Sequence, residues 1–358
     1  MNPEQLTEEL IRYRTVTGSS EEIEEGLLFI KKFFNSEFEI REFENEGVKS
    51  LLVSSQGTQK IDVLFHGHLD VVEGEEELFE PRNEGERIYG RGSADMKSGL
   101  ACLMKVLKEE KSQGLGLLVT SDEEKGGFNG TGYVVEEEGL RPELVISAEP
   151  DDSKVFPSVV TRQKGVLQVK VSVKGKSAHA SKPENGENAA EQIIDIYREK
   201  IRPLFDHSHD FPTTVNLGRI KSGDMVNRVP NNAEIYLDIR YSDQYPKGEV
   251  LKDLKNLDGI EVEITAEAPM METSEKNIRV QELEESIEKI SGNGPEFRSE
   301  AFASDMRFFT EKDIPAICFG PEGYNLHNRD EYVETESLHN YCEILKNFLQ
   351  STLDKRPD

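Results

Sequence analysis

The sequence predicts an α/β protein with a mostly parallel sheet, interrupted by a smaller α+β domain. Short apolar runs alternate with segments of helical apolar spacing over residues 1–163, which is typical of strand–helix repeats. From residue 164 the runs alternate strictly between apolar and polar residues, as half-exposed strands do. The first pattern returns near residue 275. We therefore expect one domain built from residues 1–163 and 275–358, with residues 164–274 inserted into it.

The elements of the larger domain follow from apolar periodicity and length. Six segments before the insertion and three after it have helical or strand character. The expected helices cover 4–13, 21–34, 98–110, 282–290 and 338–349, and the expected strands cover 61–65, 115–119, 144–146 and 316–319.

The inserted domain has its own order of elements. Strands are expected at 166–173, 213–217, 234–241 and 261–264, and helices at 189–200 and 249–256. This βαββαβ order predicts a ferredoxin-like fold.

Composition excludes several classes of protein. The 43 basic and 70 acidic residues give a net charge of −27, which excludes nucleic acid as a partner, because binding it requires clustered cations. The 3 cysteines show no paired spacing, so we expect reduced thiols. The N-terminus has no secretion leader and no apolar run could span a membrane, which predicts a cytoplasmic protein with no membrane contact.

Polar residues that could bind metal follow the predicted strands. His68 and Asp70 come after the first strand, Glu123 and Glu124 after the second, and Glu149 after the third. In open α/β sheets, ligands bind at the carboxyl ends of the strands. Two further candidates are Asp95, which opens a helix, and His327, which follows the last strand. Together these imidazoles and carboxylates predict a two-metal hydrolytic site.

The spacing of the first two candidates suggests their roles. His68 and Asp70 are two residues apart, so an extended backbone points both side chains to the same side. His68 can then bind a metal while Asp70 orients its ring, although a lone His-X-Asp is more often a surface loop. The glycines around Arg91 lack the third glycine of a dinucleotide-binding loop. They instead allow the backbone to approach a metal centre where Asp95 would bridge two ions.

The adjacent carboxylates predict a ligand and a base. Glu124 would bind metal, and Glu123 would take a proton from the attacking water and return it to the leaving amine. The alternative is a solvated acidic turn. The expected ligand sets are His68, Asp95 and Glu149 for one ion and Asp95, Glu124 and His327 for the other. Mixed imidazole and carboxylate ligands favour zinc, with cobalt or manganese as alternatives.

These residues lie in motifs that resemble one enzyme family. The motifs are His66-Gly67-His68-Leu69-Asp70-Val71-Val72, Gly90-Arg91-Gly92-Ser93-Ala94-Asp95-Met96-Lys97-Ser98-Gly99, Ser121-Asp122-Glu123-Glu124, Ala148-Glu149-Pro150 and Leu326-His327-Asn328. In this order they resemble the two-zinc deacylases and exopeptidases that include acetylornithine deacetylase, succinyl-diaminopimelate desuccinylase and glutamate carboxypeptidase. The resemblance implies a zinc-peptidase-like catalytic domain with a lid that forms a homodimer.

The resemblance also implies further site residues. His179, in the segment Gly175–Ala180, looks like the family histidine that reaches a neighbouring subunit's site and stabilises the oxyanion. Asn227 and Arg240 match lid positions that contact a substrate carboxylate, although Arg240 could equally form an ion pair. Ser304 and Arg307 match a substrate-facing segment, with a surface ion pair as the alternative for the arginine. One departure is the acidic stretch 73–77, where many relatives have a longer loop with proline and tryptophan.

The expected function is hydrolysis of a linear amide by a two-metal site. The resemblance implies an enzyme that removes an N-acyl group from an amino acid. A dipeptidase or carboxypeptidase with the same site is the first alternative, since both reactions cleave an amide beside a carboxylate. A non-catalytic metal-binding dimer is the alternative from another class.

Overall fold

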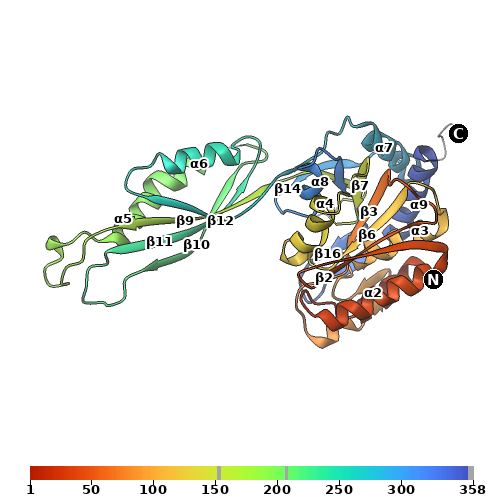
Figure 1. The fold of residues 1–358 in the computed structure, drawn as a ribbon, viewed down its shortest axis with the longest axis horizontal. Coiled ribbons are helices and arrows are strands. Elements are labelled where there is room, and N and C mark those ends of the chain that lie inside the picture. The colour runs from red at the N-terminus through yellow and green to blue at the C-terminus, as the bar shows by residue number, and fades with distance from the viewer. Residues whose placement is uncertain (151–154, 206–208, 354–358) are drawn as a thin grey trace. The chain divides into compact units, whose positions relative to one another are not determined.

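The computed structural model describes residues 1–150, 155–205 and 209–353, which fall into two compact units (Figure 1). The first unit contains Met1–Arg162, Met271–Glu300 and Ser304–Asp358, and the second contains Gln163–Met270 with Ala301–Ala303. The sequence placed the second boundary at residue 274. In the structure residues 271–274 belong to the first unit, because Thr273 donates its amide hydrogen to the carbonyl of Thr161 there.

The first unit is built on a nine-stranded sheet with the order β1-β2-β6-β3-β7-β15-β8-β13, in which β14 also pairs with β8. The four central strands β6, β3, β7 and β15 are parallel, whereas β1, β2 and β8 pair antiparallel. The expected parallel sheet therefore forms the centre, and antiparallel strands extend it. The strands are β1 (Phe38–Asn45), β2 (Val48–Ser55), β3 (Val63–His68), β6 (Leu115–Thr120), β7 (Leu144–Ser147), β8 (Ser158–Gln163), β13 (Met271–Glu272), β14 (Glu296–Glu300) and β15 (Ala316–Cys318).

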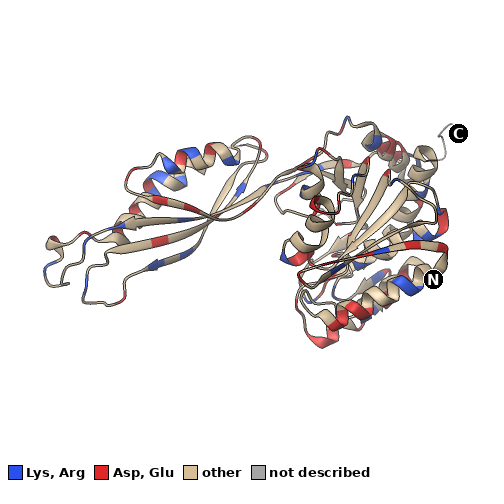
Figure 2. Ribbon diagram, in the orientation of Figure 1, with Lys and Arg blue, Asp and Glu red and all other residues tan. Residues whose placement is uncertain are grey.

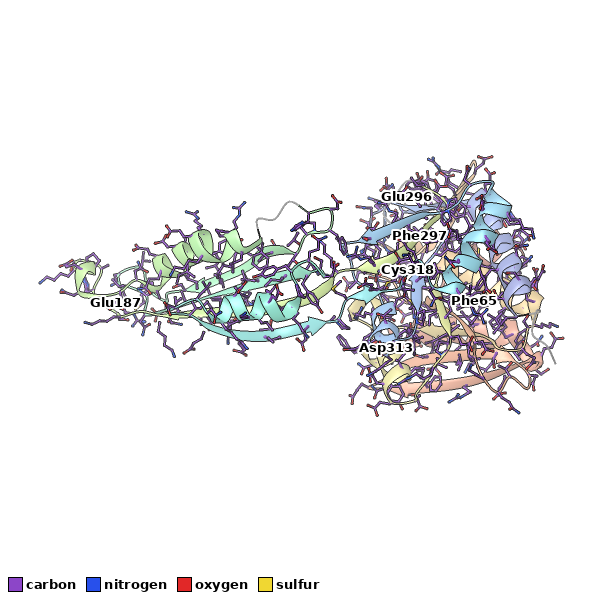
Figure 3. All side chains as sticks on the ribbon, turned by 90° about the horizontal axis from the view of Figure 1, so that it is seen from above. Phe65, Glu187, Glu296, Phe297, Asp313 and Cys318 are labelled. Carbon is purple, nitrogen blue, oxygen red and sulfur yellow. The ribbon has the colours of Figure 1, made fainter. Side chains whose placement is uncertain are left out.

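Helices cover both faces of this sheet (Figure 1). The helices of the first unit are α1 (Pro3–Arg12), α2 (Ser20–Phe34), α3 (Lys97–Glu110), α4 (Tyr133–Glu136), α7 (Ile278–Ser291), α8 (Met306–Thr310) and α9 (Thr335–Thr352). Successive residues of β3 face opposite sides of the sheet. Phe65 (Figure 3) belongs to the larger apolar core under α1, α3 and α9, and Leu64 belongs to the smaller core under α4 and α8. Burying each of these side chains contributes about 1.5–3 kcal/mol.

A small sheet joins distant parts of the chain within the first unit. Its order is β16-β17-β5-β4, with β4 (Arg82–Glu84), β5 (Arg87–Tyr89), β16 (Gly323–Tyr324) and β17 (Tyr332–Glu334). β5 and β17 pair antiparallel with Tyr89 opposite Tyr332. The segment that follows β5 and the segment that precedes β17 therefore leave the sheet at the same end.

The second unit has the predicted ferredoxin-like order βαββαβ. Its elements are β9 (Gly165–Lys174), α5 (Ala189–Ile196), β10 (Thr214–Ser222), β11 (Asn232–Tyr241), α6 (Lys247–Lys255) and β12 (Glu261–Ala268). The strands form an antiparallel sheet with the order β10-β11-β9-β12. α5 and α6 lie against one face of this sheet and bury the apolar side chains of β9 and β11 (Figure 1).

Charged residues of both signs are distributed along the elements of both units, and several glutamates lie along α2 (Figure 2). Within the ranges that the structure describes, no helix is long and apolar enough to cross a membrane.

Candidate metal centre

Four of the predicted site residues lie at the carboxyl ends of adjacent parallel strands. His68 is the last residue of β3, and Glu123 and Glu124 begin a short 3₁₀ turn after β6. Glu149 follows β7 by two residues. Because β3 lies between β6 and β7 in the sheet, these four side chains gather at one edge.

The other two predicted ligands come from loops. Asp95 lies just before α3, and its peptide bond to Met96 is cis. His327 lies between β16 and β17 with a positive φ of 63°. The sequence placed both residues at the site, and the structure brings both to it.

Asp95 joins two groups of side chains with its two carboxylate oxygens. Its Oδ1 lies 3.1 Å from Nε2 of His68, and its Oδ2 lies 3.1 Å from Nε2 of His327. Each imidazole has a second carboxylate beside it: Glu149 Oε1 is 3.3 Å from His68 Nε2, and Glu124 Oε1 is 3.2 Å from His327 Nε2. Two imidazole–carboxylate groups therefore share one central aspartate.

The donor set fits a pair of divalent cations. Glu124 Oε1 is buried and has no hydrogen-bond partner among the described residues, although His327 Nε2 is near it. Without cations the negative charge is balanced by protons. The hydrogen bond with Asp95 and the nearby carboxylate of Glu124 raise the pKa of His327 to about 10, and burial together with the charge of Asp95 raises the pKa of Glu149 to about 7. Cations at this position would replace those protons.

The ring of His68 is oriented by the backbone of Asp70. Its Nδ1 donates to the Asp70 carbonyl at 2.8 Å, while the Asp70 carboxylate oxygen Oδ1 is 3.6 Å away. Because a carbonyl only accepts, Nδ1 carries the hydrogen and Nε2 faces the centre. The role of the Asp70 carboxylate in orienting this ring stays a prediction.

The Asp70 carboxylate has a second set of partners that the sequence did not indicate. It accepts the amide hydrogens of Glu123 at 3.2 Å and Glu124 at 3.3 Å, and the hydroxyl hydrogen of Thr17 at 2.8 Å. Burial raises the pKa of Asp70 to about 6, and the charge of His68 opposes that rise. Asp70 therefore fixes the turn that carries the predicted base.

Glu123 occupies a position suited to proton transfer. Its carboxylate comes within 4.8 Å of ligand atoms of His68 and Glu149. Burial and the charge of Glu149 raise the pKa of Glu123 well above its ordinary value, despite the opposing charge of His68. A raised pKa makes the ionised form of this carboxylate a stronger proton acceptor, as a general base requires.

A buried polar network lies behind the centre, and sequence reasoning missed it. His66 contacts Ser147 Oγ through Nδ1 at 3.1 Å and Thr131 Oγ1 through Nε2 at 3.0 Å. Thr131 donates to Asp305 Oδ2 at 2.5 Å. Burial raises the pKa of Asp305, but the hydrogen bond and charge of His66 outweigh it, so this pKa stays below its ordinary value. The position of His66 two residues before His68 was the available signal, because both face the same side of β3.

Ser304 and Arg307, predicted to face the substrate, are both buried. Arg307 donates to the carbonyls of Ser304 at 2.7 Å and Gly126 at 2.5 Å, and its guanidinium packs on the ring of Phe308. These contacts brace the segment that follows Glu123. The assignment of Ser304 and Arg307 as substrate-binding residues stays a prediction.

The second unit carries the remaining predicted residues. His179 and Asn227 lie close together, because the backbone amide of Ala180, the next residue after His179, donates to the carbonyl of Asn227 at 3.0 Å. Arg240 lies at the opposite end of β11 from Asn227 and donates through Nε to Asp238 at 2.7 Å. The structure thus contains the ion pair that was the alternative for Arg240, and the substrate contacts of all three residues stay predictions.

The fold and the centre define a class: metal-dependent α/β hydrolases with imidazole and carboxylate ligands at strand ends. A model of Peptidase family M20/M25/M40 matches residues 64–351, so the chain belongs to this family. Succinyl-diaminopimelate desuccinylase of Nautilia profundicola is 27% identical over 98% of this chain and 99% of the relative. The protein of that name from Sulfurimonas denitrificans is 28% identical over 96% of this chain and 99% of the relative.

Solved structures show the same fold over the whole chain. Aminopeptidase PepT from Bacillus cereus superposes with a TM-score of 0.80 at 20% identity and covers 98% of both chains. A Bacillus subtilis protein described as a dinuclear metal-binding peptidase of the M20 family has a TM-score of 0.71 at 13% identity, with 99% of this chain and 98% of that chain covered. The predicted two-part α/β fold is confirmed by these comparisons.

Proposed function

We propose that this protein binds two zinc ions, with cobalt or manganese as possible substitutes, and hydrolyses the amide bond of an N-acyl amino acid. The observation that carries the proposal is Asp95, whose two oxygens each face a different imidazole at 3.1 Å. His68 and Glu149 would complete one ligand set, and Glu124 and His327 the other. Three carboxylate ligands and one hydroxide would balance two divalent charges.

The residues of the chain support a general-base mechanism. When bound, the two ions polarise the amide carbonyl and lower the pKa of the attacking water. Glu123 takes the proton of that water as it attacks the amide carbon, and then delivers this proton to the nitrogen of the departing amine. Asp70 holds Glu123 in place through the backbone amide of the turn.

The acyl group we propose to test first is succinyl. The relatives that align with almost the full chain are named succinyl-diaminopimelate desuccinylase, at 27% and 28% identity. The similarity of the fold to an aminopeptidase does not discriminate between acyl groups and peptides, since those structures are at most 20% identical to this chain.

We also propose that His179 stabilises the oxyanion from a partner subunit. Its Nδ1 accepts the amide hydrogen of Ser181 at 3.2 Å, so Nε2 carries the proton of the neutral ring and can donate it. The outer strand β10 of the second unit is exposed over most of its length and leaves one sheet edge for pairing with a second copy. We expect a homodimer through this unit, measurable by light scattering.

A cytoplasmic location is part of the proposal. Cys102, Cys318 and Cys342 are all buried and form no disulfide with one another, which is consistent with a reducing compartment.

The test is release of amine from a substrate panel with zinc or cobalt supplied. The panel contains N-succinyl-diaminopimelate, N-acetylornithine, other N-acetyl amino acids and simple dipeptides. Preferred cleavage of an N-acyl amino acid would support the deacylase. Preferred cleavage of dipeptides would assign the protein to the exopeptidases, and no cleavage by metal-loaded protein would contradict both.

A further inference from the structure

A buried ion pair links the two loops that carry Asp95 and His327. The side chains of Arg91 and Glu331 are 4% and 2% exposed, and Arg91 Nη1 lies 2.6 Å from Glu331 Oε2. The antiparallel pairing of β5 and β17 explains the meeting, because Arg91 follows β5 and Glu331 precedes β17. The amide of Gly90 extends this pairing by donating to the Glu331 carbonyl at 3.2 Å.

Glu331 holds the backbone of the central aspartate. Its Oε1 accepts the amide hydrogens of Ala94 at 3.0 Å and Asp95 at 3.1 Å. Its Oε2 is taken by Arg91. Both oxygens of Glu331 therefore meet donors, so a side-chain amide at this position would place an NH₂ group against one of them.

Arg91 holds the backbone of the histidine loop. Its Nη2 donates to the carbonyl of His327 at 3.1 Å, and its Nη1 donates to the carbonyl of Asn328 at 3.3 Å. His327 has a left-handed backbone, which residues other than glycine rarely adopt without support. The guanidinium therefore fixes a backbone conformation that sets the direction of the imidazole.

We propose that Arg91 and Glu331 are positioning residues that fix the distance between Asp95 and His327 before the metal binds. This inference rests on the proposed two-ion function. It predicts that Arg91 acts mainly on the ion held by Asp95, Glu124 and His327. Arg91 donates to two carbonyls of the histidine loop, and its further backbone contact is with the carbonyl of Glu73, which is not a predicted ligand. Glu331 acts on both ions, because Asp95 belongs to both ligand sets.

A purely structural ion pair would behave differently. Such a pair would lower stability when broken but would leave the two ions equally affected. The same two strands offer a matched control. Arg87 of β5 forms an exposed ion pair with Glu334 of β17 at 2.8 Å. Its removal disturbs the same strand pair without touching the ligand loops.

The experiment compares Arg91→Met, Arg91→Lys, Glu331→Gln and the control Arg87→Met. Metal-free proteins are titrated with Co²⁺ while its absorption is followed, and the amide exchange of residues 325–331 is measured by mass spectrometry without metal. We expect Arg91→Met to bind one of two equivalents about 10- to 100-fold more weakly, as for other partners that orient metal ligands. Arg91→Lys should lose less affinity for this equivalent of Co²⁺, because the positive charge beside Glu331 remains. Glu331→Gln should weaken both equivalents.

Amide exchange supplies a readout that does not depend on metal. It should be faster over residues 325–331 in the Arg91 variants and unchanged in Arg87→Met. Wild-type titration and exchange in Arg91→Met, or equal losses in Arg91→Met and Arg87→Met, would overturn the inference. If Arg91→Met does not fold, Arg91→Lys decides, because it retains the buried charge. Failure of the wild-type protein to bind two ions would instead contradict the proposed function.

Discussion

Replacing the predicted base by its amide is the sharpest test of the mechanism. Glu123→Gln keeps the shape of the side chain, and the turn is held by the Asp70 carboxylate through backbone amides at 3.2 and 3.3 Å. We therefore expect normal folding and near-normal metal content. Only the ability to accept a proton is lost.

The size of the effect follows from the environment of Glu123. Loss of a general base costs about 10²- to 10⁴-fold in rate. Burial and the charge of Glu149 raise the pKa of Glu123, which strengthens its ionised carboxylate as a proton acceptor. A loss of about 10²- to 10⁴-fold corresponds to about 3–5 kcal/mol of transition-state stabilisation.

The assay measures amine release and metal per chain in the same preparations. Glu124→Gln is the matched control, since its carboxylate lies 3.2 Å from His327 Nε2 and its loss should remove an ion as well as activity. Full activity in Glu123→Gln would refute the assignment of the base. Loss of metal from Glu123→Gln would show that Glu123 is a ligand instead.

Three further outcomes can be checked with the same protein. Asp70→Asn should reduce kcat about 10- to 100-fold at normal metal content, since an amide cannot accept every hydrogen bond of the catalytic turn; unchanged steady-state kinetics would contradict this. The neighbouring carboxylates raise the pKa of His68 and of His327 in the metal-free protein, so metal binding should release protons from these rings. Calorimetry in buffers of different ionisation enthalpy measures this release, and no buffer dependence would disprove it. Gly127→Ala should lower the free energy of unfolding by about 1–3 kcal/mol or more, because a Cβ there would lie 1.8 Å from Asp305 Oδ1; an unchanged Tm would count against the packing described.

Four of the predicted site residues could be placed together from the sequence because they follow parallel strands. A strand end is visible in apolar periodicity, and the parallel order of β6, β3 and β7 places those ends together. The ferredoxin-like unit was also predictable, since β9 alternates over ten residues. In both cases a local pattern determines the position of the side chains.

The parts that were missed depend on contacts between distant residues. Glu331 is one of 70 acidic residues, and nothing in its neighbourhood marks it as the partner of Arg91. The hairpin of β1 and β2 was not predicted, because mixed charged and apolar residues in Phe38–Asn45 obscure its alternation. Arg307 was predicted to bind a substrate carboxylate, with a surface ion pair as the alternative, yet its hydrogen bonds lie inside the first unit.

The place of β15 in the sheet bears on when the enzyme becomes complete during synthesis. This strand is made late but lies between β7 and β8, so a growing chain that has not reached Ala316 leaves the outer edge of β7 unpaired. His327 follows later still, whereas the inserted unit is nearly continuous from Gln163 to Met270. We therefore expect the second unit to fold on the ribosome before the first unit. The residues of the metal centre should come together only when synthesis of the chain is almost complete.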